Sequence, residues 1–89
     1  MKLSEVSLES VKRALKIDYS HDDELIGEIM AMAKDRIMQL TNRELDDLDG
    51  FPSVVHAFNC VCSDMYDGTD EHEKTILAIC HSIQLNMVT

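Results

Sequence analysis

The chain has 89 residues, enough for one domain with a thin core, and it carries a net charge of −9. It contains two Tyr, two Phe and no Trp, so aliphatic and Met side chains must fill the interior. Its acidity excludes the usual nucleic-acid grip, which needs Lys and Arg, and it has neither the ~20-residue apolar run of a membrane span nor a signal peptide, which predicts a cytoplasmic protein.

The first predicted helix is short. Ser7 is suited to its start, because a Ser side chain at the N-cap position accepts a hydrogen bond from the helix backbone. Leu8, Val11 and Leu15 then recur at spacings of three and four, which gives the helix one apolar face. The pattern fades near Ile17, so we expect the helix to end there.

The second predicted helix is the longest element of the chain. Ser20 followed by Asp23 resembles a capping box, and acids at positions 22–24 suit the positive end of a helix dipole. Apolar residues follow at helical spacing, and the helix should stop between Thr41 and Arg43. The residues of this stripe are Leu25, Ile26, Ile29, Met30, Ala33, Ile37 and Leu40.

Residues 44–51 hold four acids and one Gly without a sustained period, which predicts the longest connection in the chain. Pro52 then starts a third helix, and a turn at 67–70, with Thr69 or Asp70 as cap, leads into a fourth. The residues that trace these helices at helical spacing are Val54, Val55, Phe58, Val61, Cys62 and Met65 in the third, and Ile76, Leu77, Cys80, Ile83, Gln84 and Met87 in the fourth. The predicted fold class is all-α, a small bundle of about four helices with a long second helix in a single domain over residues 1–89.

Two His and two Cys in the third and fourth helices have the side-chain types of a zinc site. His56 and Cys60 share a face, but Cys80 and His81 are adjacent and point about 100° apart on a helix, which disfavours convergence on one ion. Cys60 and Cys62 are too close in sequence for a CxxC redox pair. We therefore predict reduced thiols in the core and neither metal nor cofactor, with a metal-dependent switch at His56 and Cys60 as an alternative.

The sequence also lacks the parts of an active site. It shows no Gly-rich nucleophile turn, oxyanion turn or phosphate loop beside its Cys and His residues. The acidic segments 44–49 and 64–73 lack the alternating order of a calcium loop. His21 and His72 precede helix starts, where the dipole disfavours a positive imidazolium, so neither is assigned a role. The chain is predicted not to be an enzyme.

The charges are distributed unevenly. Residues 1–43 carry eight acids and seven bases, whereas residues 44–89 carry nine acids and Lys74 as the single base. Such a subunit suits head-to-tail contacts, in which the basic first helix of one copy meets the acidic segment of the next. The alternative is that Glu9 pairs with Arg13 on its own helix and that the acidic segment is merely solvated. The candidate interface residues are Lys12, Arg13, Lys16, Glu44, Asp46, Asp47 and Asp49.

Three short sequence patterns at the ends of the first two helices follow one another in the same order as in a known family. The short helix runs from 8 to 18 and ends in LKID, an acidic cap at 22–26 reads DDELI, and the long helix ends in LTNR at 40–43. With a proline-led third helix ending in Tyr66, this arrangement resembles the tailed-bacteriophage head-to-tail connector family over most of the chain. Asn42 stands where the family prefers Gly, which is tolerable because Asn also adopts a left-handed helix cap.

The resemblance implies an adaptor that assembles as a ring beneath the portal of a filled phage head. Such a protein extends the DNA channel and receives the next head-completion or tail protein, without cofactor or chemistry. Its partners would be further copies of itself, the portal protein and a tail or stopper protein, and DNA would pass through without specific binding. It would occupy the host cytoplasm during assembly and the head-tail junction of the virion afterwards, with no contact to a membrane.

A second hypothesis belongs to a different class. The acid content and small size also suit a monomeric helical protein that occupies a basic site on another protein, as a DNA mimic or inhibitor. Self-association separates the two hypotheses, because a connector should form rings or join a portal. A mimic should instead stay monomeric and bind its target with strong salt sensitivity.

Overall fold

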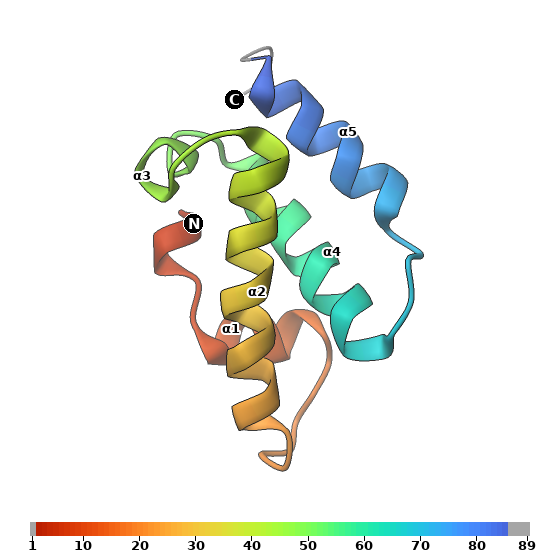
Figure 1. The fold of residues 1–89 in the computed structure, drawn as a ribbon. Coiled ribbons are helices and arrows are strands. Elements are labelled where there is room, and N and C mark those ends of the chain that lie inside the picture. Colours follow the sequence, from red (N-terminus) through yellow and green to blue (C-terminus); the bar gives the residue numbers. More distant parts are fainter. Residues whose placement is uncertain (1, 86–89) are drawn as a thin grey trace.

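The computed structural model describes residues 2–85, and every regular element in this range is a helix (Figure 1). The all-α class and the long second helix are therefore confirmed. No helix in this range is long and apolar enough to cross a membrane. In chain order the elements are a short 3-10 helix η1 (Leu3–Glu5) and the α-helices α1 (Leu8–Ala14), α2 (Asp23–Thr41), α3 (Leu45–Leu48), α4 (Ser53–Asp67) and α5 (Glu73–Gln84).

The start of α1 follows the predicted cap, whereas the start of α2 does not. Ser7 Oγ accepts a hydrogen bond from the backbone N–H of Ser10, and Ser10 Oγ accepts one from the N–H of Ser7. At α2 the N-cap is Asp22, and the predicted capping box at Ser20 is wrong. Ser20 contributes only its backbone carbonyl, which accepts from the N–H of Asp23 at 3.2 Å. The acids of the first turn still lie at the positive end of the dipole, as expected.

The end of α2 is closed in two ways. Asn42 adopts the left-handed conformation (φ 56°), and its N–H donates to the carbonyl of Met38, which confirms that Asn replaces Gly at this cap. Arg43 then reaches back into the molecule. Its Nε donates to the carbonyl of Ile83 at 3.1 Å, and its guanidinium lies 4.9 Å from the centre of the Phe51 ring. The turn after α2 is thereby fastened to the last turn of α5.

The core lies where α4 packs against α2 and α5 (Figure 1). Leu25 of α2 was predicted to face the core, but its side chain is 46% exposed. The buried face of α2 is therefore narrower than predicted. On α5, Leu77 is 43% exposed and Gln84 is exposed too, so their placement in the core is also wrong. Met87 lies outside the described residues. The buried residues of these three helices include Ile26, Ile29, Ala33, Ile37, Val54, Ala57, Phe58, Val61, Cys62, Ile76, Cys80 and Ile83.

Residues 44–51 were predicted to be a connection without structure, and this prediction is wrong. They contain α3 (Leu45–Leu48), whose Leu48 is fully buried, as is Leu3 of η1. The two elements are also joined by polar contacts, because Asp49 accepts from the N–H of Ser4 at 3.0 Å and from its hydroxyl at 2.8 Å. A single helical turn such as α3 is too short to show a repeating apolar pattern in the sequence. Its burial becomes evident only once η1 is seen packed against it.

Candidate functional site

The three basic residues of the predicted interface have different environments. Lys12 is 9% exposed, and its Nζ lies 2.7 Å from Oδ1 of Asp23. The hydrogen bond to Asp23 raises the pKa of Lys12. Arg13 and Lys16 are exposed, and within residues 2–85 neither forms an ion pair, with Glu9 or with any other acid. Lys12 therefore ties α1 to the start of α2, whereas Arg13 and Lys16 present their charges to solvent.

The four acidic residues divide in the same way. Glu44, Asp46 and Asp47 are exposed at the start of α3. Asp49 is half-buried, and the hydrogen bonds from Ser4 lower the pKa of its carboxyl. Asp49 therefore holds η1 against α3, whereas the other three acids are exposed to solvent.

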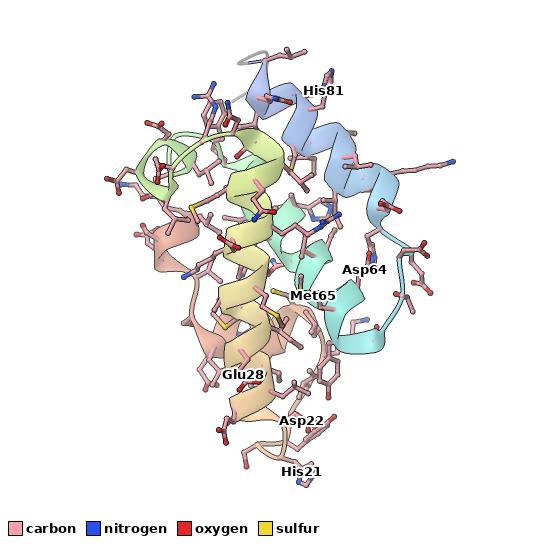
Figure 2. All side chains as sticks on the ribbon, viewed as in Figure 1. His21, Asp22, Glu28, Asp64, Met65 and His81 are labelled. Carbon is pink, nitrogen blue, oxygen red and sulfur yellow. The ribbon has the colours of Figure 1, made fainter. Side chains whose placement is uncertain are left out.

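The structure places the basic and acidic groups at opposite ends of α2. The Lys12 contact puts α1 beside the first turn of α2, and α3 follows its last turn. With 19 residues, α2 spans about 28 Å, in a molecule whose longest dimension is 39 Å. Figure 2 shows His21 and Asp22 at one tip and His81 near the opposite end. The two groups are thus too far apart to meet within one copy.

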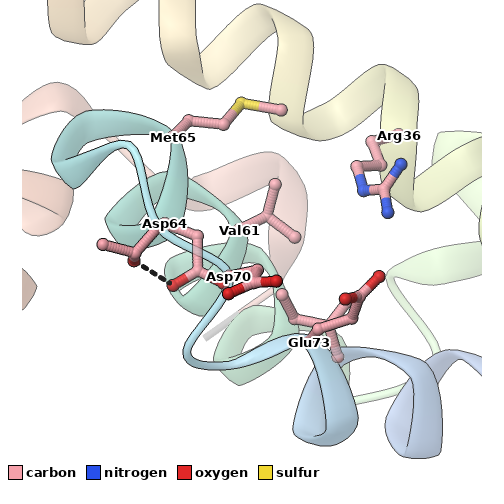
Figure 3. Close-up of a pocket in the computed structure, with 8 residues that line it drawn as sticks. Arg36, Val61, Asp64, Met65, Asp70 and Glu73 are labelled. Atoms are coloured by element: carbon pink, nitrogen blue, oxygen red, sulfur yellow. Dashed lines mark hydrogen bonds between the residues drawn. The ribbon is translucent and has the colours of Figure 1, made fainter.

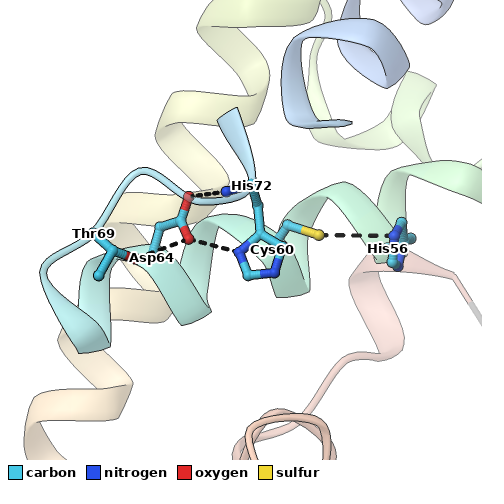
Figure 4. A network of polar contacts seen from close by, with 5 residues as sticks. All are labelled: His56, Cys60, Asp64, Thr69 and His72. Carbon is cyan, nitrogen blue, oxygen red and sulfur yellow. Dashed lines mark hydrogen bonds and ion pairs between the residues drawn. The ribbon is translucent and has the colours of Figure 1, made fainter. Parts of the chain in front are cut away.

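A buried carboxylate joins α4 to α5 (Figure 4). Asp64 is 8% exposed, and its carboxylate accepts from the backbone N–H of His72 at 3.1 Å and from the Thr69 hydroxyl at 3.3 Å. Its Oδ1 also lies 2.7 Å from Nδ1 of His72. The N-cap of α5 is His72, so neither Thr69 nor Asp70 is the cap as predicted. The hydrogen bond to Asp64 raises the pKa of His72, although partial burial acts in the opposite direction.

This contact was not predicted from the sequence. The available signal was an Asp at position 64, on a helix that is apolar at Val61, Cys62 and Met65. A carboxylate there must be hydrogen-bonded or exposed, because burial without partners is costly. The partner could not be named, since His72 meets Asp64 only after the chain has turned at Gly68, which caps α4 in the left-handed conformation.

The candidate metal ligands do not come together. Cys60 Sγ lies 3.8 Å from Nε2 of His56, as expected for positions four apart on one helix (Figure 4). On α5, Cys80 is buried and His81 is exposed. Among residues 2–85, no group of three or more His, Cys, Asp or Glu side chains could hold a metal ion. The three cysteines are free thiols, and burial raises the pKa of Cys62 to about 12 and that of Cys80 to about 11.

A groove opens between α2, α4 and the start of α5 (Figure 3). Its volume is about 270 Å³, and its floor is apolar. Arg36 of α2 stands on one side, and the carboxylates of Asp70 and Glu73 stand on the other. The sequence analysis did not single out this surface, because its residues come from three separate segments.

The family model for the phage gp6-like head-tail connector proteins matches residues 5–80. The chain therefore belongs to this family, which confirms the resemblance drawn from the helix and cap patterns. No curated protein and no solved structure matches the chain significantly. The family is one of structural phage proteins and not of enzymes, so the chain is a head-tail connector of the virion that associates with portal or tail components.

Proposed function

We propose that this connector assembles as a ring that docks on the portal, extends the DNA channel and receives the next head-completion or tail protein. The observation that carries the proposal is the separation of charge along α2. Arg13 and Lys16 are exposed near its first turn, whereas Glu44, Asp46 and Asp47 are exposed beyond its last turn. A heterologous contact between unlike ends repeats from copy to copy and can close into a ring.

In the proposed contact, Arg13 and Lys16 of one copy face the three exposed acids on α3 of the next copy. Lys12 and Asp49 support this contact indirectly. Lys12 fixes α1 on α2 through Asp23, and Asp49 fixes α3 on η1 through Ser4. Rim charges of this kind contribute orientation and association rate more than affinity, so the portal can serve as the template that brings the copies together.

The acidity of the chain also supports a role around DNA. A channel lined with acids repels phosphates, so DNA can slide through without sticking. The same acidity favours the alternative hypothesis of a monomeric DNA mimic or inhibitor. Membership of the connector family supports the ring over the mimic.

The experiment is to express the chain with and without the portal protein of the same phage. Mass in solution and electron microscopy of any large species then report assembly at about 0.15 M salt, where the Debye length is about 8 Å. We expect rings or portal-bound complexes with the wild-type chain. The double variant Arg13→Glu and Lys16→Glu should reduce the assembled fraction at least tenfold, because like charges then face each other across the contact.

The matched control reverses two exposed bases of α2 and α5 outside the proposed contact, Arg36→Glu and Lys74→Glu, and so makes the same change in net charge. This control should assemble as the wild type does. Equal assembly by all three proteins, with folding intact, would show that Arg13 and Lys16 are not at an interface. A wild-type chain that stays monomeric and ignores the portal would contradict the ring itself and favour the mimic.

A further inference from the structure

The groove between α2, α4 and α5 has an apolar floor and a charged rim. Val61 and Met65 of α4 (Figure 3), together with Ile76 of α5, are its apolar lining residues. Val61 is 2% exposed and Ile76 is 5% exposed, so both are held by the core and keep the floor in place. The groove is therefore a preformed feature of the helix packing.

The size of the groove indicates what kind of group it can hold. Pockets for drug-sized ligands and cofactors measure about 300–1,000 Å³, whereas this groove measures about 270 Å³. It is open along one side and suits a single bulky side chain. Anchors of this type, one apolar side chain buried in a pocket, carry much of the binding energy at protein interfaces.

The rim of the groove carries more acidic than basic side chains, since Arg36 on the side of α2 faces Asp70 and Glu73 on the other side. Asp70 and Glu73 are exposed on one side, and within residues 2–85 neither takes part in an ion pair. Asp64 also lines the groove, but its carboxylate is already engaged by His72 and Thr69. The carboxylates of Asp70 and Glu73 are therefore available to pair with a basic group of a partner. The acids at 67 and 71 in the same turn add to the negative potential there.

The chain itself offers no fitting occupant among its exposed apolar side chains. Those of large size in the described range are Tyr19, Leu25, Met32, Leu77 and Leu85. None of them is adjacent in sequence to Lys or Arg. Within residues 2–85 the chain therefore supplies no exposed, large apolar anchor beside a base, and a partner protein can supply one.

We propose that this groove docks a segment of a partner protein in which one bulky apolar side chain is flanked by Lys or Arg. The apolar side chain lies on Val61, Met65 and Ile76, and the basic group pairs with Asp70 and Glu73. This site is distinct from the contact proposed between copies, and it is present in a single subunit whether or not a ring forms.

The test uses the full chain, labelled with ¹⁵N, and the synthetic peptide Gly-Ser-Arg-Leu-Lys-Ser-Gly. We expect saturable shifts of backbone amides lining the groove, with weak but measurable affinity. A peptide with Ser in place of Leu, and another with Glu in place of both bases, should each bind at least tenfold more weakly. Solution mass measured on the same samples reports self-association separately, so failure of the ring and failure of the groove are distinguishable.

Matched charge-reversal variants test whether the acids of the groove rim, and not the acidity of the whole turn, bind the basic peptide. The pair Asp70→Lys and Glu73→Lys should weaken peptide binding at least tenfold, whereas the pair Asp67→Lys and Glu71→Lys, in the same turn but away from the groove, should weaken it less than threefold. If the lysine pair unfolds the start of α5, Asp70→Asn with Glu73→Gln replaces it and should still weaken binding.

Three results would overturn the proposal. The first is an absence of saturable shifts at millimolar peptide, and the second is an equal loss in both variant pairs, which would mean diffuse attraction. The third is a shift of the groove amides with protein concentration alone, which would place a second copy in the groove.

Discussion

Single residues close the turns that hold this fold together, and Asn42 is the clearest case. Its left-handed backbone ends α2 and lets Arg43 turn back to the carbonyl of Ile83. A residue with a Cβ pays about 1–2 kcal/mol in that conformation, a cost that Asn reduces and Gly avoids. The cap therefore depends on residue type more than on contacts.

We expect Asn42→Ala to lower the free energy of unfolding by about 1 kcal/mol, because Ala has neither the freedom of Gly nor the local hydrogen bonding of Asn. Asn42→Gly should leave it within about 0.5 kcal/mol of the wild type. Urea denaturation of the three proteins measures both values. A loss with Gly as large as that with Ala would mean that the Asn side chain itself is needed.

The pair His72 and Asp64 makes stability depend on pH. Because the pKa of His72 is raised in the folded chain, the imidazolium stabilises the fold fully below the unfolded pKa of about 6.5, and this contribution is lost as the pH rises through the folded pKa. The melting temperature should therefore fall as the pH rises above about 6.5. His72→Gln should flatten this part of the curve, and an unchanged slope would show that another group titrates there.

At the scale of elements, two aliphatic residues one turn apart on α2, Leu25 and Ile29, differ sharply in burial. Ile29 is 3% exposed in the core, whereas Leu25 lies one turn earlier and is 46% exposed. Both were predicted to be buried, since the apolar pattern of α2 is wider than the face that α4 and α5 cover. The apolar pattern of a helix shows which side chains are suited to burial, but the packing of the neighbouring helices determines which of them are buried.

Ile29→Ala should cost about 2–5 kcal/mol, because it leaves a cavity in the core. Leu25→Ala removes a similar side chain from the same helix and should cost less than about 0.5 kcal/mol, as is usual for surface positions. Thermal or urea unfolding measures the two losses. Equal losses would mean that a surface patch around Leu25 is covered in solution.

The longer helices could be predicted because their side chains repeat over several turns and their ends carry recognisable residues such as Ser7 and Asn42. The corner of η1 and α3 could not, since the burial of Leu3 depends on Leu48, which lies far away in the sequence. The candidate interface was predicted in part. Arg13 and Lys16 are exposed as expected, whereas the inward position of Lys12 follows from how α1 folds back on α2.

At the scale of the whole molecule, three thiols are shielded by the same core. Cys60 is 6% exposed, and Cys62 and Cys80 are at most 1% exposed. Burial raises the pKa of all three thiols, which suppresses the reactive thiolate. A thiol reagent can therefore reach Cys62 and Cys80 only when the core opens, whereas Cys60 also borders a surface pocket beside His56.

We expect all three thiols to react with a disulfide reagent in denaturant, and Cys62 and Cys80 to react in the folded protein at pH 8 at a rate that follows unfolding. Phe58→Ala, which weakens the core, should accelerate the reaction at least tenfold. Elemental analysis of the same preparation should find less than one zinc per chain. Rapid reaction of Cys62 or Cys80 in the native wild type would show that part of the core opens locally.

The carboxylate of Asp64 also has a consequence for motion. Because a side chain of α4 supplies the hydrogen-bond acceptor for the first turn of α5, neither helix can fray at that end without the other. The two helices should therefore behave as one cooperative unit in native-state hydrogen exchange, with similar opening free energies. In Asp64→Ala the amides at the start of α5 should exchange well before those of α4, and the hairpin would then open in two steps instead of one.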